Sequence, residues 1–146
     1  MDNENISGEK ALIEERRKKL KQLRDRGGAY GNSFKPQNNA FKLQEEYGRF
    51  SKEDLAEKDV KDISIAGRIV LKRVMGNASF ATLRDASGDI QIYVTKNNVD
   101  ETVYEDFKTW DLGDIVGVSG SLFKTKTDEL TIDVRDLEMI TKSLRP

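Results

Sequence analysis

Two short runs of the sequence, SFATLRD and DIQIYV, place an aromatic ring and an amide where they could bind a nucleotide. In each run the apolar residues alternate with the others, as in a half-buried strand. Ala81 and Leu83 take the buried positions of the first run, so Phe80 points outward. In the second run the same alternation sends Gln91 and Tyr93 to that outer face. A large ring beside a side chain that can read base edges predicts a platform for an unstacked nucleotide.

Both side chains also have simpler interpretations. An aromatic residue in a strand more often belongs to the core, and an exposed Gln in a strand usually has no specific role. The placement of Phe80 and Gln91 beside each other is what favours the nucleotide platform.

The composition limits the chemistry open to these residues. The chain has 146 residues, 25 basic and 26 acidic, and a net charge of -1, so polyanion binding requires a local patch. It has no His, the usual general base near neutral pH, and no Cys, which excludes disulfides, thiolate nucleophiles and zinc ribbons. The apolar runs are short and broken by charges, so neither a membrane span nor a secretion signal is predicted.

The first 60 residues are expected to form a helical extension and linker. Ser7 is a candidate N-cap for a first helix that the glycines at 27 and 28 would end. Residues 16–26 contain seven basic residues and one acidic residue, a local balance of +6, which is either a solvated helix face or a surface for phosphate contacts. Two short helices are predicted next, one near Phe41 to Tyr47 and one starting at Ser51.

From about Ile63 the hydrophobic period changes from helical to alternating. The pattern predicts three strands, a helix that begins around Asn98 and Glu101, and two further strands over about Ile115–Phe123 and Leu130–Ile140. This order is typical of a mainly β, five-stranded Greek-key OB-fold barrel with a helix between strands three and four, here over residues 61–146.

The first strand of this barrel is long and is interrupted by Gly67, as expected of a strand that bends or bulges. Its predicted buried residues are Ile63, Ile65, Ile69 and Leu71. Ligands of such barrels lie across strands two and three, between the loop after strand one and the loop between the last two strands. The first of these regions carries Lys72 and Arg73, and the second is KTKTDE, residues 124–129. By alternation Lys72 faces outward, although a bulge would exchange it with Arg73.

Several longer stretches resemble one family. VMGNASFATLRDASGDIQIYV, WDLGDIVGVSGSLFKTKTDELTI and LEMITKSLRP resemble the anticodon-binding domain of bacterial class II lysyl-tRNA synthetases, and RRKKLKQLRDRGGAYGNSF is similar to their N-terminal helix. The resemblance covers nearly the whole chain. FKTKTDEL and the terminal LRP are its most specific parts, because the related aspartyl and asparaginyl enzymes share the barrel but differ there.

The resemblance implies roles for individual residues. Phe80 matches the ring that stacks on the central uridine of the anticodon, and Gln91 matches the amide that hydrogen-bonds the edge of the same base. Glu129 matches a carboxylate that contacts anticodon bases. Contacts to the RNA backbone would come from Lys72, Arg73, Lys124 and Lys126, with Arg68 and Arg84 as weaker candidates. Tyr93 either stacks on a flanking base or covers the sheet.

The same resemblance implies a larger protein. Such a domain binds the anticodon stem-loop of the lysine tRNA, while a separate C-terminal catalytic domain ligates lysine to that tRNA with ATP and Mg²⁺, in a cytoplasmic homodimer. The class II catalytic motifs do not occur in this chain, so it is expected to have no catalytic residue, metal site or cofactor of its own and not to be an enzyme alone.

Three alternatives remain open from the sequence. The barrel could bind single-stranded nucleic acid without sequence preference. It could be the anticodon domain of a related aspartyl or asparaginyl enzyme. It could also serve only protein assembly, in line with its nearly neutral net charge.

Overall fold

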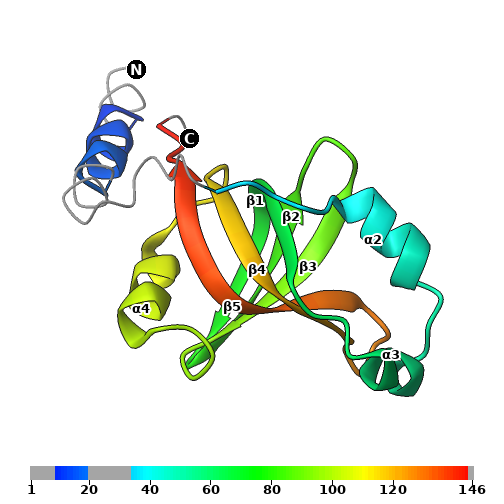
Figure 1. Cartoon of the computed structure of the whole chain (residues 1–146). Coiled ribbons are helices and arrows are strands. Elements are labelled where there is room, and N and C mark those ends of the chain that lie inside the picture. Colours follow the sequence, from blue (N-terminus) through cyan, green and yellow to red (C-terminus); the bar gives the residue numbers. More distant parts are fainter. Residues whose placement is uncertain (1–8, 20–33, 145–146) are drawn as a thin grey trace.

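A computed structural model describes residues 9–19 and 34–144. Residues 9–19 are helical, and two short helices follow, α2 (Ala40–Tyr47) and α3 (Lys52–Lys58). Three strands, one helix and two further strands complete the described chain: β1 (Ile63–Met75), β2 (Ala78–Arg84), β3 (Asp89–Thr95), α4 (Glu101–Thr109), β4 (Ile115–Lys124) and β5 (Leu130–Thr141). Figure 1 shows α4 on one side of the β-structure and α2 and α3 on the other.

The five strands form a closed barrel in the order β1-β2-β3-β5-β4. Antiparallel pairing joins β1 to β2 and β2 to β3, and β3 then pairs in parallel with β5. Antiparallel pairing of β5 with β4, and of β4 with β1, completes the ring. The predicted Greek-key barrel, with a helix between the third and fourth strands, is therefore confirmed.

Side-chain caps fix where the helices begin. The Asn39 side chain accepts a hydrogen bond from the Lys42 N–H at the start of α2, and the Ser51 hydroxyl accepts one from the Asp54 N–H at the start of α3. The predicted start at Ser51 is confirmed. The helix predicted to begin around Asn98 and Glu101 is also confirmed, since α4 begins at Glu101 with Asp100 as its N-cap.

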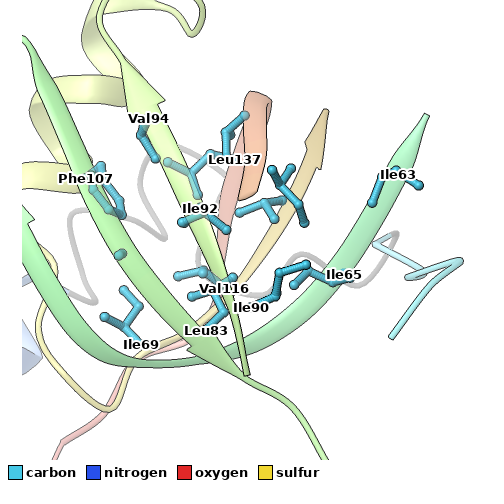
Figure 2. Close-up of a cluster of buried hydrophobic side chains, with 14 of the residues drawn as sticks. Ile63, Ile65, Ile69, Leu83, Ile90, Ile92, Val94, Phe107, Val116 and Leu137 are labelled. Carbon is cyan, nitrogen blue, oxygen red and sulfur yellow. The ribbon is translucent and has the colours of Figure 1, made fainter. Parts of the chain in front are cut away.

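The barrel interior and the packed helices share one core, part of which is drawn in Figure 2. Every strand sends alternate side chains into it, for example Leu130, Ile132 and Val134 of β5. Leu43 of α2, Leu55 of α3 and Phe107 of α4 close over the barrel. Burial of these apolar side chains holds α2, α3 and α4 against the barrel. None of the described helices is both long and apolar enough to cross a membrane.

A bulge in β1 changes which side chains face the core. Ile63, Ile65 and Ile69 are buried as predicted, but the pairing of β1 with β2 shifts between Ile69 and Leu71. One extra residue in a strand reverses the direction of all the side chains that follow. The prediction that Leu71 is buried is therefore wrong, since this side chain is 65% exposed.

Gly120 permits a second irregularity, in β4. The pairing of β4 with β5 shifts between Ser119 and Gly120. A Cβ atom at Gly120 would lie 1.9 Å from the carbonyl oxygen of Asp133, so only glycine allows the two backbones to approach this closely. The register shift in β4 thus has a steric basis.

Candidate nucleic-acid interface

Phe80 and Tyr93 lie directly opposite each other on the outer face of β2 and β3. Both side chains are half-buried, while their strand neighbours Ala81 and Ile92 fill the barrel interior. The two ring centroids are 4.7 Å apart and the ring planes are inclined by 35°. The prediction that Phe80 faces away from the core is therefore confirmed, and its ring forms part of an aromatic surface on the sheet.

Gln91 lies on the same outer face, opposite Thr82, which is two residues from Phe80 along β2. Its amide nitrogen donates a hydrogen bond to the hydroxyl of Thr131, at 3.2 Å, and that hydroxyl in turn donates to the Glu129 carbonyl oxygen, at 3.0 Å. These two linked hydrogen bonds fix the orientation of the Gln91 amide. Within residues 9–19 and 34–144 no other hydrogen bond of this amide is found, so the Gln91 carbonyl oxygen and second amide hydrogen can serve as an acceptor and a donor on the face that carries Phe80.

Phe123 of β4 adds a third ring that the sequence analysis missed. Its centroid is 6.0 Å from that of Tyr93, with the planes at 64°, so its contact with Tyr93 is edge-on. The strand pattern could have predicted this position. Leu122 is buried, and in a strand the next side chain, that of Phe123, points outward.

The bulge in β1 exchanges the two basic residues of this strand. Arg73 is opposite Phe80 and exposed, whereas Lys72 is opposite the buried Ala81. The Lys72 ammonium donates to the carbonyl oxygens of Phe107 and Trp110 at the end of α4, the latter at 2.8 Å. The preference for Lys72 as the outward residue is thus wrong, and the alternative that a bulge brings Arg73 outward is correct.

Burial also alters the acidity of Lys72. Loss of hydration lowers its pKa from 10.5 to about 8, although Asp111 and Asp114 act in the opposite direction. Its ammonium lies 4.6 Å from the Phe107 ring centroid and at the carboxyl end of a helix, where a cation is favourable. The Lys72 ammonium therefore links β1 to the end of α4, although its burial disfavours the charged form.

The two lysines around the β4–β5 loop have different environments. Lys124 is 3% exposed, and its ammonium donates to the Gly48 carbonyl oxygen at the end of α2 and pairs with Asp128 at 3.3 Å. The expectation that Lys124 faces a ligand is corrected by this burial. Lys126 and Glu129 are exposed, and in the part of the chain that the structure describes the Glu129 carboxylate has no hydrogen-bond or ion-pair partner.

Arg84 ends β2, Arg68 lies opposite it on β1, and both side chains bind within the protein. Arg84 makes two hydrogen bonds to the Asp89 carboxylate, at 2.7 and 3.0 Å, and these bonds lower the pKa of Asp89. Arg68, opposite Arg84 in the β1–β2 pairing, donates to the Gly113 carbonyl oxygen at 2.9 Å. The structure does not bring either guanidinium to the Phe80 ring.

The barrel therefore carries an aromatic and amide surface, here called the platform, which is formed by Phe80, Gln91, Tyr93 and Phe123. Arg73 is opposite Phe80 on β1, and Lys126 and Glu129 are exposed in the β4–β5 loop. Among residues 9–19 and 34–144, no group of three His, Cys, Asp or Glu side chains is arranged to hold a metal ion. The platform offers ring stacking and hydrogen bonding, which are means of binding an unpaired base.

Fold and sequence together place the chain in a known class. Residues 63–140 match the tRNA anticodon family, described as an OB-fold nucleic acid binding domain, and the chain belongs to this family.

Similar proteins narrow this further. The chain is 54% identical over 138 residues to a lysine–tRNA ligase of Dechloromonas aromatica (strain RCB), and 53% identical over 138 residues to one of Azoarcus sp. (strain BH72). Each alignment covers 94% of this chain and 27% of the relative, so the chain spans about a quarter of the length of these curated relatives. The resemblance to the anticodon-binding domain of lysyl-tRNA synthetases is confirmed.

Proposed function

We propose that the chain binds the anticodon of the lysine tRNA as the anticodon-binding domain of a lysine–tRNA ligase. The observation that carries this proposal is the outward Phe80 ring with the anchored Gln91 amide beside it. The central uridine of the anticodon stacks on Phe80. Gln91 pairs with the uracil edge, which displays an N–H donor next to carbonyl acceptors and so matches an amide.

The surroundings of the platform supply the remaining contacts. The Glu129 carboxylate would be repelled by phosphate, so its exposed position supports recognition of a base N–H. Arg73 and Lys126 contact the RNA backbone from β1 and from the β4–β5 loop. Lys72 and Lys124 do not take part, because their ammonium groups are engaged with carbonyl oxygens inside the fold.

The function of the longer protein is part of the same proposal. The names of the relatives and their greater length support a parent protein in which a catalytic domain ligates lysine to its tRNA with ATP and Mg²⁺. That parent works as a homodimer in the cytoplasm. The present chain contributes tRNA recognition, and the reaction belongs to the catalytic domain.

One titration tests the proposal. The chain is mixed at fixed salt with RNA stem-loops that carry UUU, UCU or GUC in the anticodon position, and Kd is measured by fluorescence anisotropy. The UUU loop is expected to bind most tightly, with a clear loss when the central uridine is replaced. Equal binding of all three would instead identify a non-specific single-strand-binding barrel. A preference for GUC would identify an aspartyl anticodon domain, and absence of salt-dependent binding would favour an assembly role.

A matched pair of variants localises the contact. Stacking on an aromatic ring contributes about 1–3 kcal/mol, so Phe80→Ala should weaken UUU binding by about 5- to 150-fold. Phe41→Ala is the control, because Phe41 of α2 is 55% exposed and lies outside the platform. Unchanged binding by Phe80→Ala, or a large fall in its melting temperature, would contradict the stacking role.

A further inference from the structure

The three rings of the platform form a continuous row across the sheet. Phe80, Tyr93 and Phe123 come from β2, β3 and β4, and β5 lies between β3 and β4 in the barrel. On β5 the small residue Thr131 is opposite both Gln91 and Phe123. Thr131 faces outward, because its neighbours Leu130 and Ile132 are in the core, yet it is fully buried. Side chains on the outer face must therefore cover it, and the Phe123 ring reaches past it to the edge-on contact with Tyr93.

Tyr93 already occupies one side of Phe80. Their centroids are 4.7 Å apart, which is the separation of an aromatic pair in direct contact. On its other side, across β1, Phe80 is opposite the exposed Arg73. A base that stacks on Phe80 therefore has the Arg73 side available to it, while the Tyr93 side is filled by protein.

An isolated aromatic side chain on a strand has more than one favourable χ1 rotamer, since both 180° and -60° are common there. Holding it in one rotamer on binding costs conformational entropy. Phe80 contacts Tyr93, which in turn contacts Phe123. These contacts restrict the Phe80 rotamer in the free protein, so less conformational entropy is lost on binding. The Phe80 ring is then in its stacking orientation before RNA arrives.

We propose that Tyr93 and Phe123 are positioning residues for Phe80, and that Tyr93 acts through the Phe80 ring and does not itself stack on a base. The inference rests on the proposed function, because it concerns how the central uridine is held. It assigns the same role to a ring on β4 that does not touch Phe80 in the described contacts.

The test is a double-mutant cycle on the whole chain with the UUU stem-loop. Tyr93→Leu should weaken binding about 3- to 10-fold, the size expected for loss of one aromatic pair. Tyr93→Phe retains the ring and should bind like the unaltered chain. In a Phe80→Ala background, Tyr93→Leu should have no further effect, because the ring that it positions is gone.

Phe123→Leu gives an independent measurement if Tyr93→Leu does not fold. It should weaken UUU binding about 2- to 4-fold and also lose its effect in the Phe80→Ala background. A role in folding alone would lower the melting temperature of these variants without producing this dependence on Phe80.

Two results would overturn the inference. One is a Tyr93→Leu effect of the same size with and without Phe80, which would mean that Tyr93 contacts the RNA directly. The other is weaker binding by Tyr93→Phe, which would assign the contribution to the hydroxyl group. Failure of the proposed function has a different signature, since Phe80→Ala alone would then bind UUU as tightly as the unaltered chain.

Discussion

Asp114 provides a stability test because its carboxylate is fully buried and joins distant parts of the chain. It lies just before β4. Its Oδ2 accepts a hydrogen bond from the Lys142 ammonium at 2.6 Å and another from the Asp111 N–H at 2.8 Å. Its Oδ1 accepts one from the Ser143 N–H at 2.8 Å. Three donors thus converge on one carboxylate, and two of them belong to residues that follow β5.

Asp114→Asn retains the size of this side chain but replaces one acceptor oxygen with an NH₂ group. Whichever way the amide turns, that NH₂ faces a donor. Breaking a buried ion pair costs about 3–5 kcal/mol. Because Lys142 retains Asp111 as a counter-ion, we expect the lower end, about 3 kcal/mol, or a fall in Tm of about 6–12 °C for a chain of this length.

Urea and thermal unfolding, followed by circular dichroism and by the fluorescence of Trp110, measure this loss. Asp59→Asn is the matched control, since Asp59 pairs with Lys61 at the surface, with both side chains 65% exposed, and should lose less than about 1 kcal/mol. The double variant Asp114→Asn, Lys142→Met should regain part of the loss, because it removes the buried ammonium that has lost a partner.

Two outcomes would refute this account of Asp114. The first is a loss in Asp114→Asn no larger than that in Asp59→Asn. The second is a double variant less stable than Asp114→Asn alone, which would mean that the remaining contacts of Lys142 outweigh the cost of its burial.

Two further predictions concern backbone packing and pH. Gly120→Ala should destabilise the barrel by about 3 kcal/mol or more in urea unfolding. Gly117→Ala should cost less, because the three atoms nearest to its new methyl group belong to the Phe34 side chain and not to the backbone. The pKa of Lys72 in the folded protein, about 8, lies below its ordinary value of 10.5. Between these two pH values the unfolded chain binds more protons at Lys72 than the folded chain does. The free energy of unfolding should therefore rise with pH across this window, relative to that of Lys72→Met. A flat difference between those two chains across that window would contradict the pKa shift.

Much of the fold and the centre of the platform were predictable from local pattern. Alternation fixes which side of a strand each residue faces, and this was enough to predict the outward direction of Phe80 and Gln91 and the order of the barrel elements. These predictions succeeded because β2 and β3 pair in regular register, without a bulge.

The outer parts of the site depended on long-range contacts. Lys72 and Leu71 exchange their expected directions because of a bulge whose position is set by pairing with a neighbouring strand. Phe123 joins Phe80 and Tyr93 only because the barrel closes and brings β4 within reach across β5.

Local periodicity thus determined the strands, their buried faces and the ring and amide that they display, since each of these depends on residues close together in the chain. Tertiary structure decided which basic groups remain available. Lys124, for example, donates to the carbonyl oxygen of Gly48, 76 residues earlier. A positive charge in the sequence shows only that an ammonium group is present. Whether it meets solvent or an unpaired carbonyl at a helix end depends on which elements pack against it.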